Sequence, residues 1–338
     1  MESLDVLFTG QDQVEVRREP VATLAPGEVL VRASKTLIST GTEGIVLSRL
    51  FETGGHYDRW VTYPFHPGYS MVGRVAAVGD AVTGCGQGDR VAVRKPHHQY
   101  VLASQHALVP VPEGVSDEDA TWFGLANIVQ NGVRRAEHQL GEAVAVIGLG
   151  PIGQLVVQYL RLLGARHVIA IDPVAQRLEL AAAHGATALI TARADEARDE
   201  VFRLTGGQGV DAVYDVTGAP RVFPAALRLL RRFGRLVLLG DTGTPGEQRL
   251  TGDVVTKGLR IIGAHDSNPP AESSDHALWS HARMADLFFT YLQRGDMRVG
   301  DLITHRYAPT DAPRAYALLR EQRATTLGVL FDWEGVTG

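Results

Sequence analysis

Residues 144–172, VAVIGLGPIGQLVVQYLRLLGARHVIAID, restrict the possible folds of this chain most strongly. The apolar run from Val144 to Ile147 leads directly into a glycine-rich turn, and apolar residues then recur at helical spacing as far as Gly164. A second apolar run follows and ends on an acid, Asp172. This order of strand, glycine turn, helix and strand predicts an α/β domain with a doubly wound parallel sheet.

The glycine turn itself points to a phosphate ligand. Gly148, Gly150 and Gly153 have the GxGxxG spacing, in which the first two glycines let the backbone approach a pyrophosphate and the third lets the helix lie close to the strand. Free N–H groups at the start of the helix stabilise the phosphate charge. Pro151 suits the first helical turn because it has no N–H to leave unbonded, and Ile152 begins the apolar face. These five residues form the predicted pyrophosphate site, and a doubly wound domain without a dinucleotide is the alternative.

The acid at the end of the second strand bears on the choice of cofactor. Asp172 follows Gly153 by 19 residues, close to the offset of about 20 residues that is typical of a ribose-binding acid. A carboxylate there accepts hydrogen bonds from both ribose hydroxyls and repels a 2′-phosphate. We therefore predict NAD (NADH) rather than NADP. Arg177 is the opposing signal, because a guanidinium is able to bind that phosphate.

Length, charge and cysteine content narrow the class of protein. The chain of 338 residues is long enough for two domains. Its formal net charge of −5 does not indicate the excess of basic residues that is typical of a nucleic-acid-binding protein. It contains no apolar run of membrane-spanning length, and its first residues, MESLDVLFTG, do not resemble a secretory leader. The single cysteine, Cys85, excludes an intramolecular disulfide framework. We expect a soluble, cytoplasmic protein with a small-molecule substrate and neither nucleic-acid nor membrane partners.

The pattern of strands and helices changes along the chain. Up to about Pro112, short β-branched runs alternate with turns, which predicts an antiparallel barrel or folded sheet. From about Thr121, apolar strands alternate with helical stretches, which predicts six parallel strands near residues 143–148, 167–172, 187–190, 211–216, 234–240 and 259–264. We therefore expect a β-rich domain formed by residues 1–120 and 266–338, and a nucleotide-binding domain at 121–265.

Three phrases within this organisation carry a family resemblance: GDRVAV at 88–93, VPEGVSDEDA at 111–120 and GLGPIG at 148–153. Together they resemble the medium-chain dehydrogenase/reductase superfamily over essentially the whole chain. The resemblance implies a GroES-like catalytic domain, a six-stranded Rossmann domain, a substrate bound between them, and a homodimer or homotetramer. ISTGTEG at 38–44 and HPGYSMVGRV at 66–75 look most like the zinc-lacking branch, which includes hydroxyethyl-bacteriochlorophyllide dehydrogenase-like proteins.

The chain departs from the zinc-dependent members at the metal positions. Their Cys-Gly-Ser/Thr-Asp phrase corresponds here to Thr40-Gly41-Thr42-Glu43, and their Gly-His-Glu corresponds to Gly68-Tyr69-Ser70. The thiolate and imidazole ligands of catalytic zinc are therefore replaced, and the four cysteines of the structural zinc site are missing. His97 and His98 are adjacent and so point in different directions, with no acid close in sequence. We predict that the chain binds no metal.

Without zinc, another group must exchange the proton that accompanies hydride transfer. Tyr69 is the first candidate because the resemblance puts it where the zinc-binding histidine would stand, although a packing role is the alternative. Thr40 and Thr42 are candidates for a proton relay or for orienting a substrate hydroxyl, unless they bond to backbone. Glu43 is a candidate base or hydroxyl ligand, unless it has a structural partner. His66, before a Pro-Gly turn, is the last candidate, with a surface or capping role as the alternative.

The ends of the later strands complete the predicted cofactor site. Thr217 and Gly218 follow the fourth strand of the Rossmann domain and Gly240 ends the fifth, and by resemblance they pass close to the ribose and nicotinamide. His265 follows the sixth strand and is expected at the nicotinamide end. The alternative for all of these residues is that they only end a strand and begin a loop, without contacting a ligand.

Three functions agree with this sequence. The leading one is a zinc-independent, NAD-dependent oxidoreductase acting on a secondary alcohol or ketone, with a polyol, sugar or cyclitol as substrate. The second is an NAD(P)H-dependent reductase of enones or quinones. The third is a non-catalytic NAD(H)-binding sensor. A dehydrogenase that had evolved into a binding protein without catalysis would also have lost its metal ligands.

Overall fold

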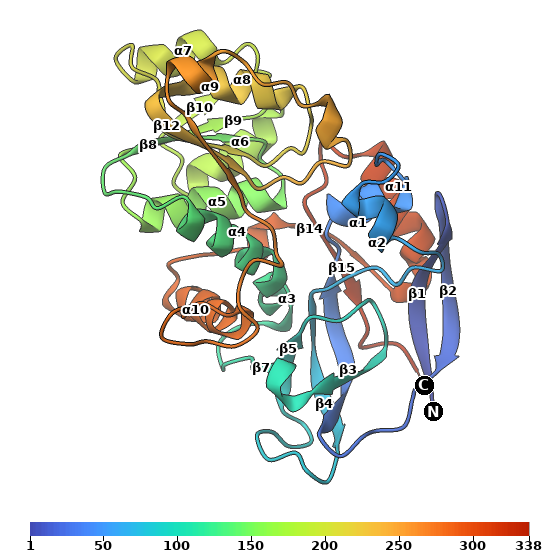
Figure 1. Cartoon of the computed structure of the whole chain (residues 1–338). Coiled ribbons are helices and arrows are strands. Elements are labelled where there is room, and N and C mark those ends of the chain that lie inside the picture. Colours follow the sequence, from blue (N-terminus) through green and yellow to red (C-terminus); the bar gives the residue numbers. More distant parts are fainter. Residues whose placement is uncertain (338) are drawn as a thin grey trace. The chain divides into compact units, whose positions relative to one another are not determined.

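The structure, a computed structural model, describes residues 1–337 and divides into two compact units (Figure 1). The first unit contains Met1–Leu50, His56–Leu125 and the chain from Trp279 onward. The second contains Phe51–Gly55 and Ala126–Leu278, so residues 266–278 group with the nucleotide-binding unit rather than with the first. Among residues 1–337, no helix combines the length and apolar character needed to cross a bilayer.

The first unit is built on a seven-stranded sheet. Its path runs β14 (Ile303–Tyr307), β15 (Gly328–Asp332), β3 (Glu28–Leu37), β4 (Met71–Val78), β5 (Arg90–Val93) and β7 (Val109–Pro110), and β6 (Tyr100–Ser104) also pairs with β3. The pairs are antiparallel except β14 with β15. Nine of the ten residues of β3 are buried or half-buried, as expected of a strand that pairs on both edges.

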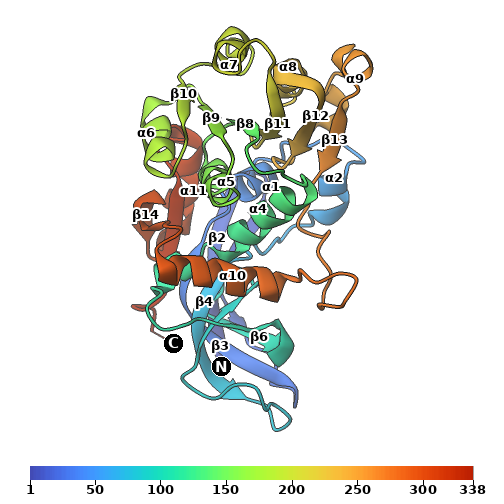
Figure 2. The ribbon, with the colours of Figure 1, turned by 90° about the vertical axis from the view of Figure 1, so that its left-hand side faces the viewer.

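A separate hairpin and five helices complete this unit. Strands β1 (Glu2–Gly10) and β2 (Gln13–Pro20) pair antiparallel, and α11 (Ala312–Glu321) packs on β2. The short helices are α1 (Thr42–Leu47), α2 (His56–Trp60) and α3 (Asp117–Ala120). Helix α10 (His281–Arg294), which Figure 2 shows along much of its length, contains the segment 284–292 that the sequence predicts as helical.

The second unit is a parallel six-stranded sheet in the order β10-β9-β8-β11-β12-β13. These strands are β8 (Ala143–Ile147), β9 (His167–Ile171), β10 (Ala188–Ile190), β11 (Val210–Asp215), β12 (Leu230–Leu238) and β13 (Arg260–Gly263). Numbered within the sheet, this is the order 3-2-1-4-5-6 of a dinucleotide-binding fold. The predicted fold class, a GroES-like domain with a six-stranded parallel Rossmann domain, is confirmed.

Helices connect the parallel strands. Helices α5 (Pro151–Leu162) and α6 (Ala175–Ala183) pack on β8, β9 and β10, whereas α7 (Arg198–Leu204) and α9 (Asp253–Thr256) pack on α8 (Val222–Leu229), which lies on β11 and β12. Helix α4 (Phe123–Arg135) carries the boundary between the units. Between the sheet and the helices α7 and α8, a core of mainly Ile, Val, Leu and Ala side chains excludes water.

Local chemistry explains the limits of α5. Pro151 occupies its first turn, where no intrahelical partner for an N–H is lost. After the last helical residue, Gly164 adopts φ +76°, a left-handed conformation that glycine takes without steric cost. The predicted end of this helix is therefore observed.

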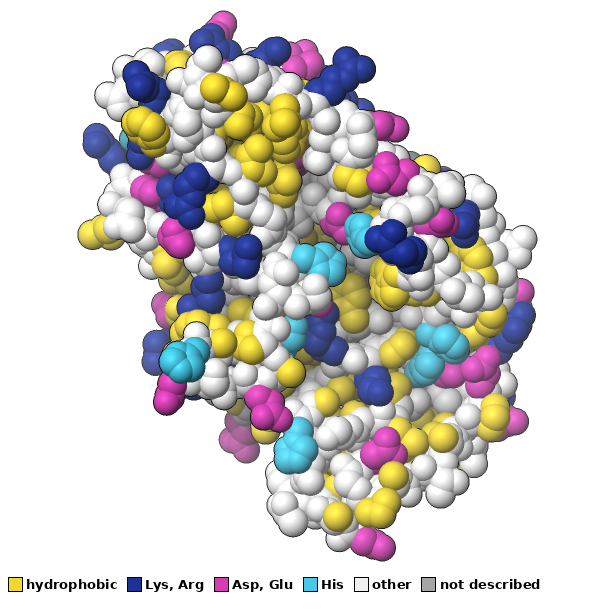
Figure 3. All heavy atoms as spheres, viewed as in Figure 1, with side chains coloured by type: hydrophobic (Ala, Val, Ile, Leu, Met, Phe, Trp, Pro, Cys, Tyr) yellow, Lys and Arg dark blue, Asp and Glu magenta, His cyan; other side chains and the backbone are white. Residues whose placement is uncertain are grey.

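Charged groups are mixed on the surface. On the face drawn in Figure 3, Lys and Arg side chains are interspersed with Asp and Glu, and the face has no continuous basic area. This distribution agrees with the small negative net charge of the sequence.

Candidate active site

The glycine turn of the second unit is closed by contacts that only glycine permits. Gly148 has φ +90°, and a Cβ there would lie 2.7 Å from Cγ2 of Thr217. A Cβ on Gly153 would lie 2.0 Å from the carbonyl oxygen of Gly148. The first and third glycines therefore allow the turn and α5 to approach each other, as the motif predicts.

The middle glycine faces open space instead. Gly150 caps α5, and a Cβ on it would meet no atom within 4 Å. The next two residues, Pro151 and Ile152, are half-buried in the first helical turn. An unfilled space at a helix N-terminus, where N–H groups lack intrahelical partners, fits the pyrophosphate of a dinucleotide.

Asp172 is joined to the same turn. It directly follows β9 and is only 4% exposed. Its Oδ2 accepts a hydrogen bond from the N–H of Leu149 at 2.8 Å, and its Oδ1 accepts one from the N–H of Val174 at 2.9 Å. Nη1 of Arg177 lies 3.8 Å from Oδ2. The sequence did not reveal that Asp172 also fixes the position of the turn.

The end of β11 lies beside the end of β8, at the carboxyl edge of the parallel sheet. Asp215 pairs in register with Ile147, the last residue of β8, so both strands end at one level. The N–H and hydroxyl of Thr217 donate to Oδ1 of Asp215 at 3.0 and 2.7 Å. Burial raises the pKa of Asp215 to about 6, against an opposing effect of these hydrogen bonds. The predicted residue Thr217 thus holds a buried acid at the sheet edge.

Two further predicted glycines lie where backbone segments meet. A Cβ on Gly240 would lie 2.5 Å from the carbonyl carbon of Val216, and one on Gly218, whose φ is +63°, would lie 2.3 Å from the carbonyl oxygen of Asp241. These glycines bring the ends of β11 and β12 together. In this strand order, β8 and β11 are the neighbours at which the direction of winding reverses, and ligands bind at that carboxyl edge.

His265 lies apart from these contacts. It follows β13 and is exposed, and its Nδ1 lies 2.8 Å from the hydroxyl oxygen of Ser267. Its backbone carbonyl accepts a hydrogen bond from the amide of Asn131. These local contacts give no indication of a ligand at His265.

In the first unit, Glu43 is held in a buried network. It is 2% exposed, and its Oε1 accepts a hydrogen bond from the N–H of Ser39 at 2.7 Å. The hydroxyl of Tyr316 donates to Oε2 at 2.5 Å, and Nε2 of His97 lies 3.2 Å from the same oxygen. Burial, followed by the charge of Glu43, raises the pKa of Tyr316 well above its usual value. The carboxylate is thus committed to structural partners.

His97 is held in this network through both ring nitrogens. Its Nδ1 lies 2.8 Å from Oγ1 of Thr36, which also accepts a hydrogen bond from Nε1–H of Trp333 at 3.0 Å, and its Nε2 lies 3.2 Å from Oε2 of Glu43. Tyr316 and Trp333 therefore reach this network from the distant C-terminal part of the chain.

Tyr69 is in a different environment from Glu43. It is half-buried, and its hydroxyl donates to Oγ of Ser39 at 2.6 Å. The guanidinium carbon of Arg94 lies 5.0 Å from the centre of its ring. Ser39, which was not among the predicted residues, connects Tyr69 and Glu43, because its hydroxyl contacts one and its N–H the other.

Thr40 and Thr42 follow Ser39 at the start of α1. Both are half-buried, with Gly41 as the N-cap residue between them. Gly41 has no side chain, so it does not cap the N–H groups at the start of α1.

His66 belongs to another cluster. Its Nδ1 lies 2.9 Å from Nε2 of His98, and Nδ1 of His98 lies 3.5 Å from Oδ2 of Asp5. Burial raises the pKa of Asp5 to about 7, and burial together with the nearby His66 and His97 lowers the pKa of His98 to about 3. Neither contact involves Tyr69 or Glu43.

The residues at the expected zinc position do not fit that ion. Thr40 and Tyr69 offer neutral hydroxyls, and the carboxylate of Glu43 already accepts hydrogen bonds from buried partners. Catalytic zinc takes three nitrogen, sulfur or carboxylate ligands. Within residues 1–337, the one group of three suitable side chains that lies close enough together is Asp5, His66 and His98.

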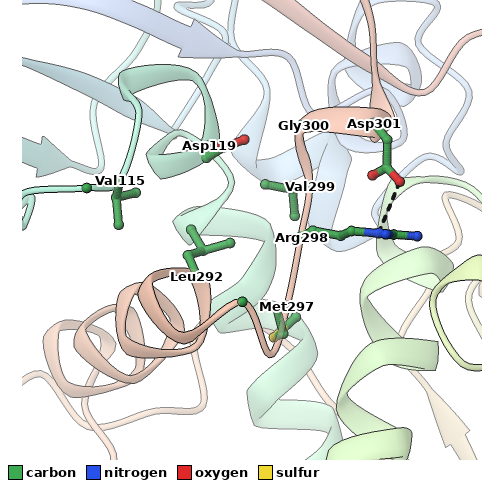
Figure 4. A pocket seen from close by; sticks show the side chains of 10 residues that line it. Val115, Asp119, Leu292, Met297, Arg298, Val299, Gly300 and Asp301 are labelled. Atoms are coloured by element: carbon green, nitrogen blue, oxygen red, sulfur yellow. Dashed lines mark ion pairs between the residues drawn. The ribbon is translucent and has the colours of Figure 1, made fainter.

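A pocket of about 440 Å³ lies elsewhere in the first unit (Figure 4). Leu292 and Met297 contribute apolar surface, and Nε of Arg298 pairs with Oδ2 of Asp301 at 3.3 Å. Its lining includes none of the predicted catalytic residues, so this pocket is separate from the candidate catalytic group.

Known protein families match the two parts of this chain separately. Residues 25–113 match the alcohol dehydrogenase GroES-like domain, and residues 151–278 match the zinc-binding dehydrogenase family. Together these matches support membership of the medium-chain dehydrogenase/reductase superfamily. The zinc-lacking branch of that superfamily is a finer assignment that these matches do not make.

Relatives in the superfamily are oxidoreductases by name. An alcohol dehydrogenase from Cupriavidus necator is 28% identical, with 96% of each chain covered. A D-guloside 3-dehydrogenase from Escherichia coli is 28% identical over 79% of this chain and 78% of its own length. A putative zinc-binding dehydrogenase from Sinorhizobium meliloti, solved with NADP, has a TM-score of 0.81 at 22% identity, covering 98% of this chain and 99% of that one. The similarities to named dehydrogenases support an oxidoreductase of this superfamily.

Proposed function

We propose that this chain is an NAD-dependent dehydrogenase that transfers hydride between the nicotinamide and a secondary alcohol or its ketone, without catalytic zinc. The observation that carries the proposal is the hydrogen bond between the Asp172 carboxylate and the N–H of Leu149 at 2.8 Å. It fixes a negative charge beside the glycine turn, where ribose hydroxyls are accepted and a 2′-phosphate is repelled. NAD is the form of the cofactor that this charge favours.

Proton exchange is the second part of the proposal. When an alcohol is oxidised, hydride leaves its carbon for the nicotinamide and a proton leaves its oxygen, so a protein group must accept that proton. We propose Tyr69 in its phenolate form as that group, with the hydroxyl of Ser39, whose Oγ lies 2.6 Å away, donating to the phenolate oxygen and so orienting it. In the reduction of a ketone, the neutral phenol of Tyr69 returns the proton to the substrate oxygen. The guanidinium of Arg94 over the ring stabilises negative charge that develops there during the transfer.

The substrate class is the third part of the proposal. Relatives include proteins named D-guloside 3-dehydrogenase and sorbitol dehydrogenase, whose substrates carry several hydroxyls. Thr40 and Thr42 are half-buried hydroxyls next to Ser39 and would bond such groups. We therefore propose a polyol, sugar or cyclitol as substrate.

Absorbance of NADH, followed with NAD and a panel of polyols, sugars and apolar secondary alcohols after exhaustive EDTA treatment, tests the proposal. NAD reduction that survives EDTA supports a dehydrogenase without catalytic zinc. Activity that is lost to EDTA and restored by Zn²⁺ overturns that part if circular dichroism and Tm show that the EDTA-treated protein is still folded at the assay temperature. Oxidation of NADH by enones or quinones alone would indicate the reductase. Tight NADH binding with no turnover would indicate a sensor.

A further inference from the structure

Three segments that are distant in sequence meet at β1. The N–H of Val6 donates to the carbonyl of His97 at 3.0 Å, and the N–H of Gln99 donates to the carbonyl of Leu4 at 2.9 Å. Further along the same edge of β1, the backbones of Phe8 and Phe65 exchange two hydrogen bonds of 2.8 Å. Asp5, His98 and His66 are therefore attached to backbone that is already fixed.

The side chains of these three residues converge. Oδ2 of Asp5 lies 3.5 Å from Nδ1 of His98, and Nδ1 of His66 lies 2.9 Å from Nε2 of His98. One donor atom from each residue can be chosen so that all three lie within 4.8 Å of one another. The group has one buried member, Asp5, and two half-buried histidines, so a small ion has access from solvent.

Two imidazole nitrogens and one carboxylate oxygen form a donor set that suits divalent transition metals, with Zn²⁺ foremost. Ligand bonds of about 2.1 Å in a tetrahedral site hold donor atoms about 3.4 Å apart. In the structure Nδ1 of His66 and Nε2 of His98 are 2.9 Å apart, and donor atoms of the three residues lie within 4.8 Å of one another, so small movements of the side chains would bring them to this spacing. The two histidines are not tied to the core as His97 is, which leaves their rings able to make this adjustment.

We propose that Asp5, His66 and His98 form a binding site for one divalent transition-metal ion, Zn²⁺ in the first instance, with the remaining position taken by water. The site uses none of the residues at the expected catalytic zinc position, Thr40, Glu43 and Tyr69. By bridging β1 to the segments around residues 66 and 98, the ion would stabilise the fold of the first unit. Hydride transfer does not pass through it.

Zinc binding to the EDTA-treated, dialysed full-length protein tests this site directly. We expect one Zn²⁺ per chain in isothermal titration calorimetry, and a rise in Tm when Zn²⁺ is added, because an ion that binds only the folded state stabilises it. Asp5→Asn, His66→Gln and His98→Gln should each weaken the affinity by about tenfold or more. The matched control is His106→Gln, at an exposed histidine of the same unit, and it should bind Zn²⁺ as the wild type does.

A second measurement on the wild-type protein does not depend on the variants folding. Bound Zn²⁺ should protect His66 and His98 from modification by diethyl pyrocarbonate, as read by peptide mass mapping, while His106 stays reactive. Absence of stoichiometric Zn²⁺ binding, or binding that leaves both histidines reactive, would overturn the proposal. So would folded variants that bind Zn²⁺ as tightly as the control. Because dehydrogenase activity is not a readout here, failure of this site leaves the proposed function intact.

Discussion

The carboxylate of Asp172 accepts a hydrogen bond from the backbone N–H of Leu149 at 2.8 Å, and so connects the end of β9 to the glycine turn after β8. One acid thus has two functions in the proposed site. It determines the shape of the turn, and it places a negative charge beside the space for the ribose. In a variant without the charge, the ratio of cofactor affinities reports the second function and Tm reports the first.

Asp172→Asn should reduce the preference for NADH over NADPH by about tenfold, because the charge that repels the 2′-phosphate is lost. The Asn oxygen keeps one of the two backbone hydrogen bonds and the NH₂ group cannot accept the other, so a fall in Tm is expected as well. The ratio of dissociation constants, measured by fluorescence titration, checks this. Asp199→Asn, at an exposed aspartate of the same unit, is the control. An unchanged ratio in Asp172→Asn would mean that this acid does not face the ribose.

Two glycines of the turn should respond differently to alanine. Gly150→Ala should leave Tm almost unchanged, because its Cβ would meet no protein atom within 4 Å, but weaken NADH binding by about tenfold by filling the phosphate space. Gly153→Ala should lower Tm, because its Cβ would lie 2.0 Å from the Gly148 carbonyl oxygen. Thermal melts and NADH titrations of both variants check the pair. Equal NADH affinity in Gly150→Ala and wild type would argue against a pyrophosphate at this position.

Tyr69→Phe should lower kcat by about 10²-fold or more with little change in Tm, because the phenol oxygen that exchanges the proton is lost. Steady-state kinetics on the substrate found in the panel provides the measurement. Tyr63→Phe is the matched control, since that half-buried hydroxyl donates to the Val46 carbonyl of the same unit. A change confined to KM would assign Tyr69 to substrate packing.

Glu43→Gln should lower the free energy of unfolding by about 2–4 kcal/mol, because the amide presents a donor to partners that already donate, Tyr316 and His97. Urea denaturation gives the value. Tyr316→Phe should cost about 1.5–3 kcal/mol, since one hydrogen bond to the buried carboxylate is lost and the acid keeps the others. Wild-type stability together with loss of turnover in Glu43→Gln would instead indicate a catalytic base.

The stability of the protein should depend on pH through Asp215. Its pKa is about 6 in the folded chain against an ordinary value of 3.8. Between about pH 4 and 6 the folded state therefore holds a proton that the unfolded state has released. The contribution of this group to the free energy of unfolding should fall as pH rises through that window. Denaturation of wild type and Asp215→Asn across pH 4–7 checks this, and parallel pH profiles for the two proteins would contradict it.

Much of the second unit could be predicted from local sequence. The strand, turn, helix and strand of residues 144–172 occur as expected, and the six alternating apolar runs form six parallel strands. Buried parallel strands read as continuous apolar runs, and a helix begins and ends at identifiable residues such as Pro151 and Gly164. These signals lie within a few residues of the elements they specify.

The sequence by itself determined the Rossmann unit, the glycine turn and the likeness of both domains to a dehydrogenase superfamily, because those features depend on short-range patterns. Only the tertiary structure decided what the polar side chains contact. Glu43 receives Tyr316 from 273 residues away, and Asp5 meets His66 and His98 because backbone hydrogen bonds hold their segments to β1. The physical reason is that a buried polar group needs a partner in space, and folding supplies that partner from any distance along the chain.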